Sequence, residues 1–511
     1  MPPFSRREFC LTVGSVPLLL PAAGHALKRS GDELFAYGVA SGDPLLRRVI
    51  LWTALRPELV TKRADVEWRV YADEALTQLV SGGTAPTDAE RGFTVKVDAG
   101  GLQPGTTYYY QFAAAGAVSE VGRTRTLPAS DVERVRLGVV SCSNYPYGFF
   151  NAYGRLAQED NIDAVLHLGD YIYEYENGVY GDGTPLDRVP DPNREIVSLD
   201  DYRRRYAQYR SDVQLQAVHA RHPFIAVWDD HESTNNSWKD GAENHNPELG
   251  EGDWETRKRV SIKAYFEWMP VRERPWLPEQ ERIYRAFRFG RLADLTMLDT
   301  RLIGRDEQLP IGDPGLADPS RELIGVRQEN WLKRRLAASQ QRQTRWRLIG
   351  QQVVFSQVSL DQGVSTINTD QWDGYAPARD RILEFIETGN IDNVVILTGD
   401  IHSSWGNEIA RNPFDPAGYS PLATEFVTPA VTSPAIEDED EAAALAALVQ
   451  GTNPQVKYLD LFRRGYMVVD ITPEQVQTDW YHLNTIDAVD DTAVLAQSLR
   501  VLSGSNELQS V

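Results

Sequence analysis

Acidic residues and histidines gather at three points of the chain, each directly after a short apolar run. The segment LHLGDYIYEY places Asp170 after Gly169 and Tyr173 three positions later. The glycine permits a tight turn, so the carboxylate can project from the end of a strand. The other two segments are VWDDHESTNN, with Asp229, Asp230, His231 and Asn235, and LTGDIHSSW, with Asp400 and His402.

These residue types are ligands for metal ions. A carboxylate can bridge two ions, a phenolate can bind a ferric ion, and a set of oxygen ligands suits Ca²⁺. In an extended chain, side chains two positions apart point to the same face, so Asp400 and His402 can reach one cluster of ions. Adjacent residues point to opposite faces, which makes Asp230 a stronger candidate than Asp229.

Cys142 lies in the segment RLGVVSCSNYPYG, at the end of another apolar run. The only other cysteine is Cys10, near the start of the chain. If the N-terminal segment is removed, Cys142 has no partner for an internal disulfide. It is then either a small buried hydrophobe, a metal ligand or a nucleophile, and its place at a strand end favours the metal ligand.

Several elements must position these residues. Strand-length apolar runs alternate with helical patterns after residue 136, which predicts a sheet covered on both faces. Ligands of such sheets bind beyond the carboxyl ends of the strands. Before it, residues 34–128 alternate with the two-residue period of an antiparallel β-sandwich similar to fibronectin type III modules. The residues from about 486 onwards are polar and predict a terminal tail or helix.

The N-terminus and the charge suggest where the protein works. Residues 1–30 contain Arg6 and Arg7 before a weak apolar run and resemble a twin-arginine export signal, the alternative being a chance basic start. No later run is long enough to span a membrane. The net charge is −21, which argues against nucleic acids and anionic membranes as partners. We therefore expect a periplasmic or secreted protein that uses the twin-arginine export machinery and has no transmembrane anchor.

The segments GDYIY, DDHE and GDIH, in this order after Cys142, resemble the motif blocks of the metallophosphoesterase superfamily. Their departures from the usual blocks are similar to those of PhoD-type alkaline phosphatases. The segment GQQVVFSQ lacks the histidine of a further superfamily block, so no ligand is transferred there. The resemblance implies an α/β fold, a metallophosphoesterase-like sandwich of mixed β-sheets flanked by helices and preceded by the small antiparallel β-sandwich.

The resemblance also implies roles for individual residues. One ion, Fe³⁺, would be held by Cys142, Asp170, Tyr173 and His402. Asp170 would bridge to Ca²⁺ at a second site completed by Asp230 and Asp400. His231 would assist the phosphate chemistry, and Asn235 would bind a metal or a phosphate oxygen or serve only as a loop hydrogen bonder.

The resulting hypothesis is an exported, metal-dependent phosphoesterase that attacks small-molecule or lipid phosphate esters with a metal-activated water. The alternative is a phosphodiesterase or phospholipase D, and a third possibility is a noncatalytic metal- or carbohydrate-binding protein. The expected organisation is a signal peptide over 1–30, a β-sandwich domain over 31–130, a catalytic domain over 131–485 and a tail or helix over 486–511.

Overall fold

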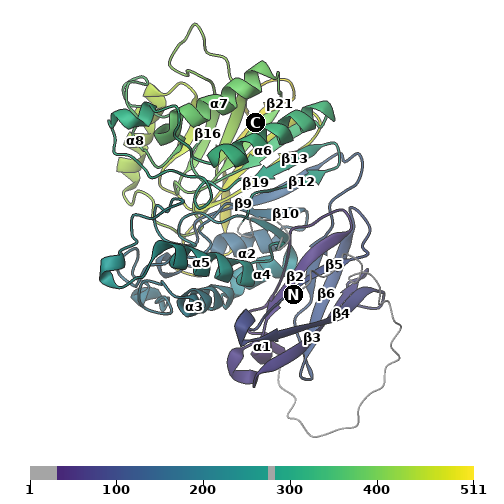
Figure 1. Cartoon of the computed structure of the whole chain (residues 1–511). Coiled ribbons are helices and arrows are strands. Elements are labelled where there is room, and N and C mark those ends of the chain that lie inside the picture. Colours follow the sequence, from purple (N-terminus) through teal and green to yellow (C-terminus); the bar gives the residue numbers. More distant parts are fainter. Residues whose placement is uncertain (1–30, 274–281) are drawn as a thin grey trace, which may run out of the picture.

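The computed structural model describes residues 31–273 and 282–511. It is an α/β sandwich in which two large sheets face each other and helices cover their outer sides (Figure 1). The expected signal peptide, residues 1–30, lies outside the described residues. The fold class predicted from the sequence is confirmed.

The larger sheet has 10 strands in the order β22-β21-β20-β19-β9-β10-β11-β1-β2-β5. At its centre, β9, β10 and β11 are parallel, and β1 is parallel to β11. The strands are β1 (Val39–Gly42), β2 (Arg48–Ala54), β5 (Thr94–Gly100), β9 (Val135–Val140), β10 (Ala164–His167), β11 (Pro223–Ala226), β19 (Gly465–Ile471), β20 (Gln475–Leu483), β21 (Ala493–Leu502) and β22 (Leu508–Ser510).

The second sheet has seven strands in the order β12-β13-β14-β15-β17-β16-β18, of which β13, β14, β15 and β17 are parallel. A parallel bridge between Ser141 and Ala430 links the two sheets beyond the ends of β9 and β17. The strands are β12 (Arg285–Phe289), β13 (Ala293–Met297), β14 (Trp346–Gly350), β15 (Val394–Thr398), β16 (Ser404–Ile409), β17 (Ala423–Val427) and β18 (Val456–Asp460).

Helices cover the outer faces of both sheets (Figure 1). On β14, Leu348 joins the main core together with residues of the larger sheet, whereas Ile349 packs with helix residues such as Leu332 and Ile382. This alternation follows from the two-residue period of a strand buried on both faces. The helices are α1 (Gly31–Leu34), α2 (Asn151–Gln158), α3 (Leu199–Arg210), α4 (Val213–Arg221), α5 (Trp254–Trp268), α6 (Gly325–Gln341), α7 (Ala376–Thr388) and α8 (Glu439–Thr452).

The N-terminal β-sandwich shares a sheet with the rest of the chain. Its own sheet contains β3 (Arg63–Tyr71), β4 (Leu79–Asp88), β6 (Thr107–Ala114), β7 (Ala117–Val118) and β8 (Gly122–Arg125). The opposing layer is the β1-β2-β5 end of the larger sheet, and residues from both layers form one apolar core. The N-terminal module is therefore continuous with the rest of the fold through the pairing of β1 with β11.

The prediction for the C-terminal residues was wrong. Residues 486–511 were expected to form a tail or helix, but β21 and β22 extend the larger sheet at its edge. Leu499 and Val501 are buried there, while Val494 and Leu495 are exposed, so the strand buries one face at only one end. The mixed exposure weakens the apolar alternation that identifies a strand in a sequence.

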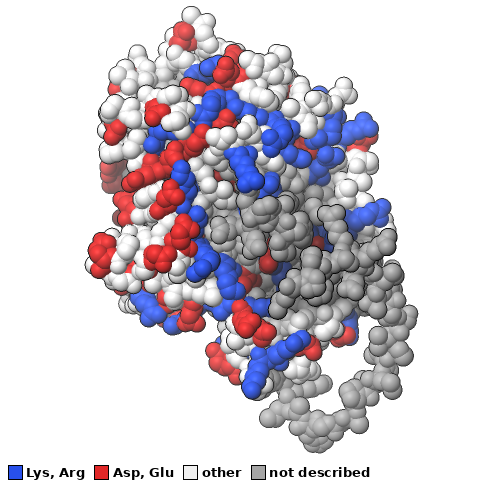
Figure 2. Space-filling view, in the orientation of Figure 1, with Lys and Arg blue, Asp and Glu red and all other residues white. Residues whose placement is uncertain are grey.

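No helix among residues 31–273 and 282–511 is both long and apolar enough to cross a membrane. On the face shown in Figure 2, basic side chains are most frequent at the upper right and acidic side chains along the left.

Candidate active site

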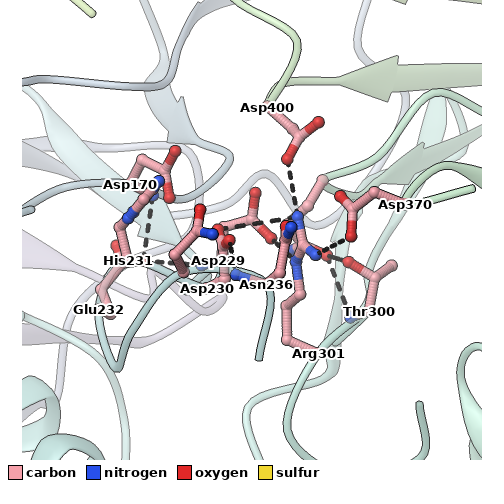
Figure 3. A network of polar contacts seen from close by, with 12 residues as sticks. Asp170, Asp229, Asp230, His231, Glu232, Asn236, Thr300, Arg301, Asp370 and Asp400 are labelled. Carbon is pink, nitrogen blue, oxygen red and sulfur yellow. Dashed lines mark hydrogen bonds and ion pairs between the residues drawn. The ribbon is translucent and has the colours of Figure 1, made fainter. Parts of the chain in front are cut away.

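The carboxyl ends of the parallel strands of both sheets meet at one place. Cys142 follows β9, Asp170 follows β10, and Asp229 and Asp230 follow β11. From the second sheet, Arg301 follows β13, and Asp400 and His402 follow β15. Figure 3 shows Asp170, Asp229, Asp230, Arg301 and Asp400 converging from different loops. The sequence prediction that strand ends build one site is supported by this arrangement.

The backbone is held in an uncommon conformation at four of the predicted ligands. Cys142, Asp170, Asp400 and His402 all have positive φ, between 56° and 64°. The left-handed region costs an L-residue roughly 1–2 kcal/mol, so such residues persist only where the surrounding structure requires them. Their concentration in one cluster indicates that the loops are shaped to present these side chains.

Gly169 allows the loops after β10 and β11 to approach each other. Its φ is +108°, and a Cβ at this position would lie 2.4 Å from the Asp229 Cβ and 2.7 Å from the Asp229 backbone nitrogen. A side chain at residue 169 would therefore separate Asp170 from Asp229 and Asp230. This is the structural reason for the glycine before Asp170.

The first predicted ligand set converges on one point. Ligand atoms of Cys142, Asp170 and His402 lie within 4.8 Å of one another. The Tyr173 hydroxyl is 2.9 Å from Asp170 Oδ2 and 3.2 Å from His402 Nε2. His402 Nδ1 is 2.7 Å from the Pro434 carbonyl, which fixes the proton on Nδ1 and leaves Nε2 free to bind a metal. A thiol, a carboxylate, a phenol and an imidazole thus face the same small volume.

Burial governs the protonation of this set. It raises the pKa of Cys142 and that of Tyr173 well above their usual values, and the negative charge of Asp170 adds to both shifts. It lowers the pKa of His402 to about 4, so the imidazole is neutral at neutral pH, as a metal ligand must be. Binding a cation here requires the thiol and the phenol to release their protons.

The second predicted set contains two carboxylate oxygens without partners. Asp170 Oδ1 and Asp230 Oδ1 are buried and accept no hydrogen bond within the described parts of the chain. Asp170, Asp230 and His231 also offer ligand atoms within 4.8 Å of one another. Buried, unpaired carboxylate oxygens are unfavourable unless a cation neutralises them, so these residues fit a bound hard cation.

Both carboxylate oxygens of Asp400 have hydrogen-bond donors within the protein. Its Oδ1 accepts a hydrogen bond from Arg301 Nη2 at 2.7 Å, and its Oδ2 accepts one from Gln371 Nε2 at 2.7 Å. Burial raises its pKa to about 6 although Arg301 acts in the opposite direction. Asp400 therefore already has a cationic neighbour within the chain.

Arg301 is the centre of the acidic network (Figure 3). Its side chain is fully buried, and it donates hydrogen bonds to Asp229, Asp370 and Asp400. Asp230 Oδ1 lies 3.7 Å from Arg301 Nη2, beyond hydrogen-bond distance. A guanidinium with donors in a rigid fork suits this arrangement of several carboxylates.

His231 is bound by a buried carboxylate on one side. Its Nδ1 is 2.7 Å from Glu174 Oε2, so Nε2 is the nitrogen available to a ligand in the cavity. Burial disfavours the imidazolium, but Glu174, Asp230 and Asp170 together hold the pKa of His231 well above its usual value. The backbone nitrogen of Asn235 also donates to Glu174, at 2.7 Å, and the Asn235 side chain lines the cavity.

Glu232 holds the two acidic loops together. Its carboxylate accepts hydrogen bonds from the backbone nitrogens of Asp170, Tyr171 and Asp229, at 3.0, 2.7 and 2.8 Å. These bonds join the loop after β10 to the loop after β11. Glu232 thus sets the separation of the acidic side chains while pointing away from the cavity wall.

The site opens into a polar cavity of about 300 Å³. Its wall includes Asp170, Asp230, His231, Asn235, Asp400 and His402. Cys142 and Tyr173 are buried behind this wall, with exposed fractions of 0% and 1%. The cavity is large enough for a phosphoryl group above the ligand sets, and its wall carries both acidic oxygens and imidazole nitrogens.

Sequence reasoning missed several residues of the site. Arg301 and Glu232 stand beside recognised acidic motifs at strand ends, so their positions carried a usable signal. Glu174 follows Tyr173 directly and was not singled out. Asp370 lies in a long loop between β14 and α7, with no strand before it, and only the fold brings it to Arg301.

Comparison with known proteins agrees with this geometry. A family model described as "PhoD-like phosphatase" matches residues 137–480, and one described as "PhoD-like phosphatase, N-terminal domain" matches residues 22–128. The chain is 36% identical over 463 residues to "Alkaline phosphatase D" of Bacillus subtilis (strain 168), covering 87% of this chain and 77% of that protein. The solved "Structure of PhoD" superposes with a TM-score of 0.86 at 33% identity, covering 94% of this chain and 92% of the other. Two facing sheets, an acidic strand-end site and these matches together show that the chain belongs to the PhoD-like phosphatase family.

Proposed function

We propose that this phosphatase is metal-dependent and that it hydrolyses phosphate esters in the polar cavity. The observation that carries the proposal is that the buried Asp170 Oδ1 and Asp230 Oδ1 accept no hydrogen bond from the described residues and lie next to the converging side chains of Cys142, Tyr173 and His402. Bound ions would act there as Lewis acids that activate water and neutralise the charge of the phosphoryl group.

The chemistry of the donors supports different ions at the two positions. Cys142, Asp170, Tyr173 and His402 combine sulfur, oxygen and nitrogen ligands, a set suited to Fe³⁺. On the side of Asp230 the donors are oxygens, which suit Ca²⁺. Asp170 would serve both positions, since its Oδ1 is unpaired and its Oδ2 already contacts the Tyr173 hydroxyl.

The remaining residues have roles that follow from their contacts. His231, held at Nδ1 by Glu174, can present Nε2 to the leaving oxygen and supply its proton. Asn235 lines the cavity and is placed to donate an amide hydrogen bond to a phosphate oxygen. Burial raises the pKa values of Asp229 and Asp400, and their ion pairs with Arg301 oppose that shift.

We further propose that the protein is exported through the twin-arginine route to the periplasm or the exterior, with residues 1–30 as its signal. This rests on Arg6 and Arg7 in the sequence and on Cys142 being the only cysteine that would remain. Export in the folded state would allow the buried thiol to be protected before it reaches an oxidising compartment. The domain division at about residue 130 is proposed with it.

The test is hydrolysis by the purified protein after chelation and after reloading with Fe³⁺ and Ca²⁺. We expect turnover of a simple phosphate monoester only in the reloaded protein, and its loss in Asp230→Asn. Asp212→Asn is the matched control, since Asp212 is an equally buried aspartate that pairs with Arg188 outside the site.

The same assay separates the alternative functions. Faster turnover of a diester or of phosphatidylcholine than of the monoester would favour a phosphodiesterase or phospholipase D. Full activity in the chelated protein would refute metal dependence. No hydrolysis of any ester by the reloaded protein would refute the enzymatic proposal and favour a binding protein.

A further inference from the structure

A second, apolar pocket of about 410 Å³ lies beside the polar cavity. The two share Asn368, Gln371 and Ile401 on their walls. Ile401 stands between Asp400 and His402 in the sequence, and Gln371 donates to Asp400 at 2.7 Å. The two cavities are therefore adjacent and have part of one wall in common.

The wall of this pocket consists mainly of aliphatic and aromatic side chains. Val358, Leu360 and Ile367 come from the loop after β14, Trp405 from β16, and Leu445 and Val449 from α8. Its volume lies in the range of small-molecule sites, which is about 300–1,000 Å³. No sequence motif marks it, because its residues come from segments that are distant in the chain.

The polar side chains on this wall already have partners. Ser403 Oγ donates to the Ile401 carbonyl and accepts a hydrogen bond from the Trp405 indole at 2.8 Å. The Asp373 carboxylate accepts a hydrogen bond from the Val358 nitrogen and is paired with Arg379. The pocket therefore offers no free charge to a ligand, and an alkyl group can enter without stranding a polar atom.

Large apolar side chains at the pocket remain accessible to water. The exposed fractions are 43% for Leu360, 39% for Ile367 and 36% for Leu445. Apolar side chains that gather around a cavity and stay exposed are typical of ligand-binding grooves. A hydrocarbon chain would cover them and release the water that they contact.

Together these observations identify a specificity site. We propose that the pocket binds the alkyl chain of the ester substrate, so that the preferred substrates are phosphate esters of alcohols with a medium or long hydrocarbon chain. This rests on the proposed function for the position of the phosphoryl group, and it adds the substrate class. Leu445 of α8 and Ile367 of the loop after β14 would determine the preference for chain length.

The experiment is a series of alkyl phosphates from ethyl to octyl, each used below its micelle-forming concentration. Burying one methylene group of the substrate should raise kcat/KM about fourfold. We therefore expect kcat/KM to rise on the order of 10²-fold between ethyl and hexyl phosphate and then to level off. Leu445→Gln should lower kcat/KM for octyl phosphate about tenfold and leave ethyl phosphate unchanged. Leu448→Gln is the matched control, because Leu448 is an exposed leucine of the same helix that does not line the pocket.

A second variant and a binding measurement test the pocket independently of Leu445→Gln and of turnover. Ile367→Asn should reproduce the effect of Leu445→Gln from the loop after β14. Calorimetric binding of octylphosphonate against ethylphosphonate tests the pocket without turnover, so the pocket can be supported even if hydrolysis fails. Equal kcat/KM and equal binding along the series, or a chain preference that survives both variants, would overturn the proposal.

The same variants distinguish the source of the chain. A preference already present with monomeric octyl phosphate indicates soluble amphiphiles as substrates. A preference that appears only with phosphatidic acid diluted into phosphatidylcholine vesicles, and that Leu445→Gln removes, indicates lipids within a bilayer.

Discussion

Replacing Arg301 by glutamine would remove the cation around which the acidic network is built. The guanidinium is fully buried and donates to Asp229, Asp370 and Asp400. Removing one partner of a buried ion pair costs about 3–5 kcal/mol. Since Arg301 neutralises several carboxylates, we expect the free energy of unfolding of the chelated protein to fall by about 4–5 kcal/mol at about pH 8.

The loss should depend on pH in a defined direction. Burial already raises the pKa of Asp400 to about 6, and it raises the pKa of Asp229 well above its usual value, both with Arg301 present. Without Arg301 these pKa values rise further, so the folded chain binds protons that the unfolded chain releases. The stability of the variant therefore decreases as pH rises, and the loss should shrink to about 2 kcal/mol near pH 5.

Denaturant titration of wild type and variant, in chelator and at both pH values, measures this effect. Arg301→Lys is the control that keeps the charge but cannot reach three carboxylates at once, so its loss should be intermediate. Adding Ca²⁺ should stabilise Arg301→Gln more than wild type, because a bound cation can replace the missing one. A loss below about 1 kcal/mol at the higher pH, or one that is independent of pH, would refute the reasoning.

Three further predictions address iron, buried histidine and glycine. Tyr173→Phe should abolish the visible charge-transfer absorption of the iron-loaded protein, and a wild type that is colourless yet active would rule out Fe³⁺ on this phenol. Burial lowers the pKa of His222 from 6.5 to about 4, so the free energy of unfolding falls as pH drops through this interval. His222→Gln should reduce the slope of that free energy against pH by about 1.4 kcal/mol per pH unit. An unchanged slope would contradict the assignment. Gly169→Ala should lower the free energy of unfolding by about 3 kcal/mol or more and remove activity. Gly178 also has positive φ but has open space where a Cβ would lie, so Gly178→Ala should lower it by only about 1–2 kcal/mol. Similar losses for the two variants in thermal or denaturant unfolding would show that the approach to Asp229 is not the cause.

Much of the fold and of the metal-binding candidates could be predicted because their signals are local. The central parallel strands after residue 136 are mostly apolar runs, as in β10 and β15, and Asp170, Asp230 and Asp400 follow the ends of such runs. Residues at the carboxyl ends of parallel strands meet by the geometry of the sheet, so their spacing in the chain does not matter. The same reasoning places Cys142 beside them before any distance is known.

The parts that could not be predicted depend on contacts between distant segments. Asp370 reaches Arg301 only because the loop after β14 folds back over the site. Glu232 was visible as a residue of the DDHE motif, but its task, binding the backbone of the loop after β10, has no signature in sequence. The C-terminal strands were missed because an edge strand that is exposed over part of its length does not alternate clearly between apolar and polar residues.

The contacts around the site suggest that the chain itself sets the ligand geometry. Glu232 ties Asp170 to Asp229 through backbone nitrogens, and His402 is oriented by the Pro434 carbonyl. None of these bonds uses an atom that a cation would need. Cys142, Asp170, Asp400 and His402 also have left-handed backbone conformations. Each such conformation costs roughly 1–2 kcal/mol, which the rest of the folded structure must offset.

If the proposed ions bind, a site organised in this way would bind them mainly by exchanging protons. The loops that carry the ligands are already ordered in the folded protein, so ion binding would not have to supply the free energy for ordering them. What remains is the removal of protons from Cys142 and Tyr173, whose pKa values burial raises. Affinity for the first ion should therefore increase steeply with pH, with about two protons released for each ion bound when the thiol and the phenol both become ligands. A titration with a pH indicator would measure that number directly, and release of none would show that neither side chain binds the ion as an anion.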